Sequence, residues 1–347
     1  MTIETVSKSL IDPFGRTVDY IRVSVTDRCD FRCVYCMPRE IFGPGYAFLP
    51  RKDLLTLEEI ARVAQVFAAL GMRKVRITGG EPLIRRNLEH LIEMIGATEG
   101  VQDISLTTNG SMLTADRAVS LKQAGLKRLT ISLDALDDAT FKSINDVDYP
   151  ASRVLDGIDN ARAAGFADIK VNAVVRRGFN EHAVLDLVKH FRHSGCIVRF
   201  IEYMDVGETN GWNLDDVIPA ADLVDRIDAL YPLEAVSPNY PGEVAKRWRY
   251  RDGAGEIGFI TSVTQSFCGD CSRARLSAVG ELYTCLFGTQ GHDLRSLLRS
   301  GADDAQLLQA VSEIWQERAD RYSELRATAT PVPLTGQAKV EMSHIGG

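Results

Sequence analysis

Hydrophobic positions recur with two different periods between residues 20 and 203. Apolar residues at every second position predict strands at 20–25, 73–78, 103–108, 127–133, 168–175 and 196–203. Apolar residues at helical spacing between those runs predict helices near 56–70, 86–97, 114–124, 152–164 and 181–193. The repeated alternation of strand and helix indicates an α/β fold with a parallel sheet and right-handed crossovers. An incomplete TIM-like barrel and a doubly wound sheet both fit this order of elements.

The polar faces of the predicted strands carry basic residues. In the first strand, Ile21 and Val23 share one face while Arg22 lies on the other. The same alternation places Arg76 and Lys170 on the polar faces of the second and fifth strands. The apolar faces must pack against the helices, so the polar faces converge on a common interior. Because unpaired cations are costly to bury, we predict that an anionic ligand fills this interior; pairing with internal carboxylates is the alternative.

The alternation of strands and helices stops after about residue 235. Residues 244–285 predict short strands separated by turns, and two helices are expected near 292–299 and 303–318. We therefore divide the chain into an N-terminal arm, a region of alternating strands and helices, a C-terminal domain and a polar tail that ends in Gly-Gly. These parts are residues 1–19, 20–235, 236–320 and 321–347.

Three cysteines with spacings of four and three follow the first predicted strand; this first triad is Cys29, Cys33 and Cys36. Thiolates bind soft metals and iron–sulfur clusters. A [4Fe–4S] cluster normally takes four cysteines, so three would leave one iron open for a small molecule, by analogy with the open position of catalytic zinc sites. A structural zinc loop and three unrelated core cysteines are the alternatives.

Three further cysteines form a second triad: Cys268, Cys271 and Cys285. They fit either another three-cysteine cluster or a zinc site completed by a distant histidine such as His292. If 271–276 is a strand, Arg273 and Arg275 share one face with Cys271. Arginine side chains suit phosphate oxygens, although a solvated arginine pair on an edge strand fits the same pattern.

Polar segments end several of the predicted strands, where α/β folds place their sites. They are residues 78–82 (TGGEP), 107–110 (TTNG), 132–134 (SLD) and 202–207 (EYMDVG). A lone Gly-Gly is usually only a turn. Four polar strand ends together with the cysteine loop predict a site at this edge of the sheet.

Composition narrows the class of protein. A formal net charge of −7 over 347 residues argues against a broad nucleic-acid-binding face. The sequence contains no apolar run of the roughly 20 residues that a membrane span needs. The N-terminus has neither a signal-peptide nor a transit-peptide pattern, so we expect a cytoplasmic protein. Seven cysteines without a secretion signal make a disulfide framework improbable.

Together, these motifs resemble those of the GTP 3′,8-cyclase family, which are radical S-adenosylmethionine (SAM) enzymes that open molybdenum cofactor biosynthesis. The resemblance covers nearly the whole chain and rests on CxxxCVYCMP, ITGGEPLIR, LTTNG, ISLDAL, KVNAVVRRG, RFIEYMDVGETNGW, FCGDCSRARLSAVGELYTCLF and the terminal SHIGG. It implies an incomplete TIM-like (β/α)6 barrel. A C-terminal, partly antiparallel β layer with helices would close the barrel opening.

The resemblance also implies a role for individual residues. The two cysteine triads would each hold a [4Fe–4S] cluster. The implied SAM contacts are Tyr35, Gly80, Ser132 and Met204. The implied GTP contacts are Arg22, Arg76, Thr108, Lys170, Arg273, Ala274 and Arg275. Gly346 and Gly347 would thread into the site and, with Arg22, take part in catalysis.

The implied reaction converts GTP to 3′,8-cyclo-7,8-dihydro-GTP with release of methionine and 5′-deoxyadenosine. The implied partners are GTP, an electron donor and the next enzyme of the pathway, cyclic pyranopterin monophosphate synthase; the chain could be a monomer or a homodimer. A radical SAM enzyme that modifies peptides is one alternative. A non-catalytic iron–sulfur or zinc protein is the other.

Overall fold

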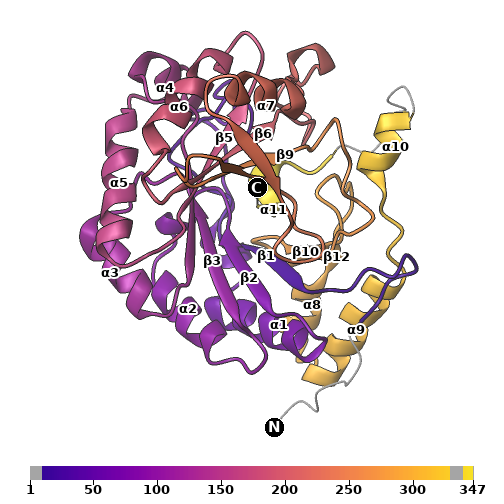
Figure 1. The fold of residues 1–347 in the computed structure, drawn as a ribbon. Coiled ribbons are helices and arrows are strands. Elements are labelled where there is room, and N and C mark those ends of the chain that lie inside the picture. Colours follow the sequence, from indigo (N-terminus) through magenta and orange to yellow (C-terminus); the bar gives the residue numbers. More distant parts are fainter. Residues whose placement is uncertain (1–9, 329–338, 347) are drawn as a thin grey trace.

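The computed structural model describes residues 10–328 and 339–346. Six parallel strands form the centre of the fold in the order of the sequence, as predicted (Figure 1). They are β1 (Tyr20–Ser24), β2 (Lys74–Thr78), β3 (Asp103–Thr108), β4 (Arg128–Ser132), β5 (Lys170–Val175) and β6 (Ile197–Glu202). Because consecutive strands are neighbours throughout, the sheet follows the barrel order and not the doubly wound one.

Most helices pack around the outside of this sheet, and one short C-terminal helix lies at its centre (Figure 1). They are α1 (Leu57–Ala69), α2 (Leu88–Gly96), α3 (Ala115–Gln123), α4 (Asp138–Asn145), α5 (Ala151–Ala163), α6 (Val184–Phe191), α7 (Ala220–Asp228), α8 (Leu294–Arg299), α9 (Asp304–Gln316), α10 (Tyr322–Thr328) and α11 (Met342–Ile345). Short 3₁₀ turns are η1 (Arg51–Asp53), η2 (Pro82–Ile84), η3 (Glu181–Ala183) and η4 (Leu214–Asp216). The capping box of α1 forms, since the Thr56 hydroxyl accepts from the Glu59 amide at 3.1 Å and the Glu59 carboxylate accepts from the Thr56 amide at 2.8 Å.

Two helices of the barrel, α4 and α7, were not predicted. The α4 helix has only 8 residues, and Phe141 and Ile144 are its buried apolar side chains, too few to establish a period. Its start is fixed locally because the Asp137 carboxylate accepts from the Thr140 amide at 2.8 Å. The α7 helix follows the sixth predicted strand and buries Leu223 and Ile227, four residues apart.

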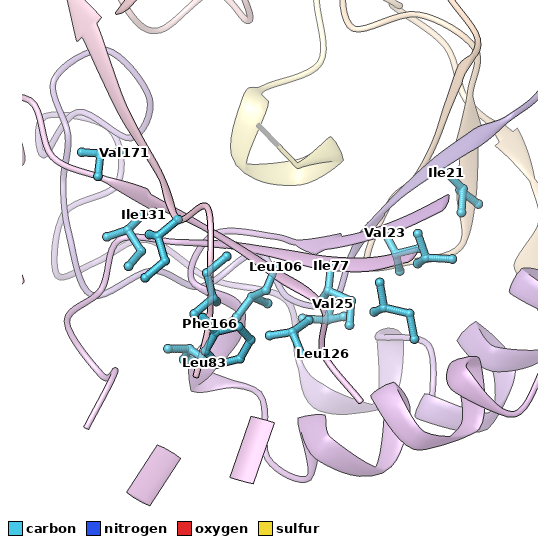
Figure 2. Close-up of a cluster of buried hydrophobic side chains, with 14 of the residues drawn as sticks. Ile21, Val23, Val25, Ile77, Leu83, Leu106, Leu126, Ile131, Phe166 and Val171 are labelled. Atoms are coloured by element: carbon cyan, nitrogen blue, oxygen red, sulfur yellow. The ribbon is translucent and has the colours of Figure 1, made fainter. Parts of the chain in front are cut away.

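The predicted alternation within strands is confirmed, and it fixes the position of the core. Ile21, Val23 and Ile77 are fully buried. In Figure 2 they lie with Leu106, Ile131 and Val171 between the strands and the helices, whereas the C-terminal segment lies on the opposite side of the strands. Each such side chain stabilises the fold by about 1.5–3 kcal/mol relative to its exposed state. The opposite face of the strands is left for polar chemistry.

Strands from the C-terminal part extend the same sheet at both edges. The β10 strand (Arg273–Leu276) pairs parallel with β1, and β9 (Glu256–Ile260) pairs parallel with β6. Beyond them, β11 (Glu281–Tyr283), β12 (His292–Asp293), β8 (Lys246–Tyr250) and β7 (Leu233–Val236) complete a 12-stranded sheet through antiparallel pairs. The C-terminal part is therefore partly antiparallel, as predicted, and it continues the barrel sheet.

Helices α8 and α9 confirm the two helices predicted after residue 290. An ion pair of 2.7 Å between Arg62 and Asp304 joins α1 to α9. The predicted boundary at 235/236 falls within β7, so the domain limits stay a prediction. None of the helices in the described ranges is long and apolar enough to cross a membrane.

Both ends of the described chain pack onto this body. In the predicted arm, Leu10 and Val18 are buried in the core, while residues 1–9 lie outside the described residues. In the predicted tail, the polar sequence indicated no helix, yet α10 and α11 form there. Figure 1 shows α11 at the centre of the barrel, next to the C-terminus. The tail therefore reaches the region where the polar strand faces meet.

Candidate active site

A cavity of about 310 Å³ opens on the polar face of the sheet, and both cysteine triads line it. Most of the predicted site residues meet there: Arg22, Cys29, Cys33, Tyr35, Cys36, Arg76, Gly80, Thr108, Ser132, Lys170, Met204, Cys268, Cys271, Arg273, Arg275 and Cys285. Ala274 does not, because alternation along β10 turns its side chain into the core, where it is fully buried. Gly347 lies outside the described residues. Residues from distant parts of the sequence thus share one cavity.

The loop that carries the first triad is held by α4. The amides of Arg32 and Val34 donate to the carbonyls of Asn145 and Ile144, at 2.9 and 3.0 Å. The Phe31 ring packs edge-on against Phe141 of α4, with centroids 6.2 Å apart. The position of the three thiols therefore depends on a helix that the periodicity did not reveal.

The three thiols of the first triad are suited to a metal cluster. Burial, reinforced by neighbouring acidic groups, raises the pKa of Cys29 well above its usual range, and burial likewise raises the pKa of Cys33. Such thiols ionise only beside a cationic partner such as a metal. In the part of the chain that is described, no three His, Cys, Asp or Glu side chains converge as ligands of a single ion. Thiols spread around a cavity fit a cluster, in which each cysteine ligates a different iron.

A buried glutamate, Glu81, connects the end of β2 to the end of β3. Its carboxylate accepts from the Thr108 hydroxyl and the Asn109 amide, both at 2.7 Å. Burial raises the pKa of Glu81 to about 7, although these hydrogen bonds oppose the change. The Gly80 amide donates to the Thr26 carbonyl at 2.8 Å and joins this segment to the loop before the first triad. The Thr108 hydroxyl, implied as a GTP contact, is engaged by Glu81 in this structure.

A second buried carboxylate, Asp134, holds Tyr35, one of the residues implied as SAM contacts. It accepts from the Tyr35 hydroxyl at 2.9 Å and from the Val174 amide at 2.8 Å. Burial raises its pKa to about 6. Asp134 ends the SLD segment that the sequence singled out, but its role as a partner of Tyr35 depends on a contact across 99 positions.

Four basic residues, which we call the cation wall, lie on consecutive or neighbouring strands: Arg22, Arg76, Lys170 and Arg199. The hydrogen bonds of Arg76 and Arg199 go to neutral oxygens, namely Thr107 at 3.2 Å and Asn172 at 2.9 Å. Burial, followed by the repulsion of Arg76, lowers the pKa of Arg199 to about 9. Burial and the repulsion of Arg199 lower the pKa of Lys170 to about 7. The positive charges of Arg76 and Arg199 are therefore not offset by these neutral partners.

Sequence reasoning did not select Arg199. The signal was present, because Val198 and Phe200 are buried on the core face of β6 while Arg199 projects to the other face. The same alternation had identified Arg22 and Arg76 on their strands. Applied to the sixth strand, it would have found the fourth member of the cation wall.

The second triad is surrounded by arginines. Arg318 donates to the Cys271 carbonyl at 2.6 Å, and Arg16 donates to the Cys268 carbonyl at 3.1 Å. Burial opposes ionisation of Cys271, but Arg273 and Arg318 outweigh it and lower its pKa to about 6. This cysteine is therefore prepared to bind a metal as a thiolate. The parallel register of β10 and β1 places Arg275 beside Arg22.

The tail enters the cavity between β2 and β10. The Gly346 carbonyl accepts a hydrogen bond from Arg275. Gly346 has φ +75°, and a Cβ there would lie 2.3 Å from the Cγ2 atom of Thr78. Only glycine fits at this position without moving β2.

Comparison with known proteins gives the same assignment as the motifs. The family model described as "Radical SAM superfamily" matches residues 23–191, and "Molybdenum Cofactor Synthesis C" matches residues 196–324. The "GTP 3′,8-cyclase" of Acidothermus cellulolyticus is 54% identical over 97% of this chain and 98% of that protein. The "GTP 3′,8-cyclase" of Staphylococcus epidermidis is 45% identical over 97% and 98%.

Solved structures support the fold. The crystal structure of Streptococcus suis SuiB bound to S-adenosylmethionine superimposes with a TM-score of 0.59 at 14% identity, over 86% of this chain and 69% of that one. A likeness at this identity concerns the fold alone. The resemblance drawn from the sequence is confirmed by the curated relatives, and the chain belongs to the GTP 3′,8-cyclase family of the radical SAM superfamily.

Proposed function

We propose that the protein cyclises GTP to 3′,8-cyclo-7,8-dihydro-GTP, with SAM as co-substrate, at the first step of molybdenum cofactor biosynthesis. The observation that carries this proposal is the single cavity in which two cysteine triads and the cation wall face one another. The relatives' name favours GTP over a peptide substrate. The paired metal-binding triads and the family also argue against a non-catalytic binding protein.

Cys29, Cys33 and Cys36 would hold a [4Fe–4S] cluster, and Tyr35, Gly80, Ser132 and Met204 would surround the SAM bound to it. When bound, this cluster and SAM supply the radical that removes the ribose H3′ of GTP. The contribution of the chain is orientation. Asp134 fixes the Tyr35 side chain, and Glu81 fixes the strand ends around Gly80. The Tyr35 side chain and these strand ends therefore do not have to be ordered when the ligands bind.

Cys268, Cys271 and Cys285 would hold a second [4Fe–4S] cluster, which would supply a binding position for the guanine base. The cation wall, with Arg273 and Arg275, would bind the triphosphate. Arg22 lies beside Arg275 in the register of β1 and β10. There it would act in catalysis together with Gly346 and Gly347. In this account the polar faces of the strands hold C3′ and C8 of GTP in a reactive geometry.

The enzyme would work in the cytoplasm as a monomer or homodimer, receive its electron from a separate donor, and pass its product to cyclic pyranopterin monophosphate synthase.

An anaerobic product assay tests the proposed activity. The protein is reconstituted with iron and sulfide, and about eight iron atoms per chain are expected for two cubane clusters. Dithionite, SAM and GTP are then added, and mass spectrometry should find 5′-deoxyadenosine together with an isomer of GTP. Four iron atoms per chain would contradict the second cluster. Deoxyadenosine without a GTP isomer, from fully loaded protein, would contradict the substrate.

The low pKa of Lys170 predicts how GTP affinity depends on pH. Bound triphosphate favours the charged ammonium, so binding raises the pKa of Lys170 from about 7 in the free protein. The contribution of Lys170 is therefore complete below pH 7 and is lost as pH rises toward the bound-state pKa, by up to about tenfold per pH unit. In the Lys170→Arg variant the guanidinium stays charged over this pH range. The affinity of the variant for GTP should therefore decline less above pH 7 than that of the wild type. Titration of GTP itself is common to both proteins, so superimposable pH profiles would contradict this role.

A further inference from the structure

The segment before α11 bridges two loops of the cavity. The Val340 amide donates to the Gly288 carbonyl at 3.3 Å, three residues after Cys285. On the other side, Lys339 and Glu341 contact the loop at 205–209, which follows Met204. The path of the tail is therefore fixed by contacts that precede the terminal glycines.

Glu341 fits a socket in that loop. Its carboxylate accepts from the Glu208 amide at 3.0 Å and from the Thr209 hydroxyl at 2.8 Å. Gly207 has φ +73°, and a Cβ there would lie 2.2 Å from the Oε2 atom of Glu341. The carboxylate thus occupies the space that a side chain at position 207 would take.

Lys339 forms the second contact with the same loop. Its ammonium donates to the Oδ2 atom of Asp205 at 3.0 Å and to the Asp205 carbonyl at 3.2 Å. The Lys339 amide donates to a carboxylate oxygen of Glu208 at 3.1 Å. Asp205 is buried and also accepts from the Tyr322 hydroxyl of α10 at 2.6 Å. One loop therefore fixes the tail through Lys339 and Glu341 and contacts α10 as well.

We propose that Lys339 and Glu341 are positioning residues, a tail latch that docks on residues 205–209 and holds Gly346 in the cavity. This inference rests on the proposed role of the tail in cyclisation. Gly346 is only five positions beyond Glu341, so anchoring Glu341 confines the end of the chain near Thr78 and Arg275. The latch lowers the entropy that ordering the tail would otherwise cost at each turnover.

Two substitutions open the latch from opposite sides. Glu341→Ala removes the carboxylate, and Gly207→Ala fills its socket. The matched control is Gly211→Ala in the following loop segment, where φ is +61° but no atom lies within 4 Å of the added Cβ. The control has the backbone strain of a left-handed residue without the obstruction.

Hydrogen exchange of the peptide covering 342–346 measures tail placement without any enzymatic assay. Both latch variants are expected to raise this exchange by about tenfold or more, because hydrogen bonds to a charged group are lost, while Gly211→Ala and the peptides of β3 remain as in the wild type. The two latch substitutions should not be additive, since Gly207→Ala obstructs nothing once the Glu341 carboxylate is gone. Unchanged tail exchange in both single variants, or full additivity, would overturn the latch.

Turnover then separates the latch from the proposed function. In the loaded enzyme, both latch variants should lose cyclisation kcat by about tenfold or more, with GTP KM and deoxyadenosine formation retained. If tail exchange rises while cyclisation is unchanged, the docking is real but its role in catalysis is wrong. If wild-type enzyme forms no cyclised product at all, the proposed function fails, and the hydrogen-exchange result for the latch still stands.

Discussion

Gly346→Ala is expected to lower cyclisation by about a hundredfold or more, since displacing a catalytic element by about 1 Å has effects of that size. The added methyl group would lie 2.3 Å from the Cγ2 atom of Thr78, and φ +75° strains any side chain. The tail must then leave its place beside Arg275. Because the first triad and the residues around it are untouched, deoxyadenosine should still form from SAM. Product analysis by mass spectrometry measures both outcomes in one reaction.

Two further variants show whether the effect comes from this contact. Gly301→Ala, at φ +85° with no atom within 4 Å, introduces the same backbone strain away from the cavity and should leave turnover unchanged. Thr78→Ser removes Cγ2 and keeps the hydroxyl, so combining it with Gly346→Ala should restore part of the cyclisation. Normal turnover of Gly346→Ala, or no recovery in the double variant, would contradict the steric account.

Arg199→Ala is expected to weaken GTP binding by about thirtyfold, the lower end of the range for removing one partner of a buried charged contact. The reason is that Arg199 is half-buried in the cation wall with neutral oxygens as partners, so its charge is available to a polyphosphate. Equilibrium binding of GTP to the anaerobically loaded protein measures the loss. Arg249→Ala is the control, since Arg249 lies on the surface and pairs with Glu234.

The same substitution, Arg199→Ala, should leave the thermal stability of the ligand-free protein unchanged or raise it. A half-buried cation with neutral oxygen partners costs free energy of folding, so the ligand-free Arg199→Ala protein should melt at a temperature equal to or above that of the wild type. A large loss of thermal stability together with weaker binding would instead mean that Arg199 is structural. Weaker GTP binding without a loss of thermal stability would identify the cation wall as a binding site maintained against the stability of the empty protein.

Much of the fold could be predicted from periodicity because the barrel strands are amphipathic. Ile21, Val23 and Arg22 show the pattern that placed the core on one side and the cationic cavity on the other. The helix α4 could not be predicted in this way, since Phe141 and Ile144 alone define no period. Nor could the pairing of β9 with β6 and β10 with β1, which joins strands separated by long stretches of sequence.

The candidate site, too, could be predicted from the sequence only in part. The cysteines and most of the basic residues carry their chemistry in their identity and spacing, so the sequence located them, although it missed Arg199. Glu81 and Asp134 act by holding Thr108 and Tyr35, and those contacts exist only in the folded chain. The docking contacts of the tail could be predicted even less. Residues 339–346 show no hydrophobic period, and the loops that they contact come from other parts of the chain.

The most direct test of the central claim uses GTP labelled with deuterium at ribose C3′. The anaerobic reaction of the loaded enzyme with SAM should transfer deuterium into 5′-deoxyadenosine, and the cyclised nucleotide should lack it at C3′. Mass spectrometry of both products reports the transfer. Unlabelled deoxyadenosine, formed while all deuterium remains in the nucleotide, would contradict removal of H3′ from a GTP molecule held in this cavity.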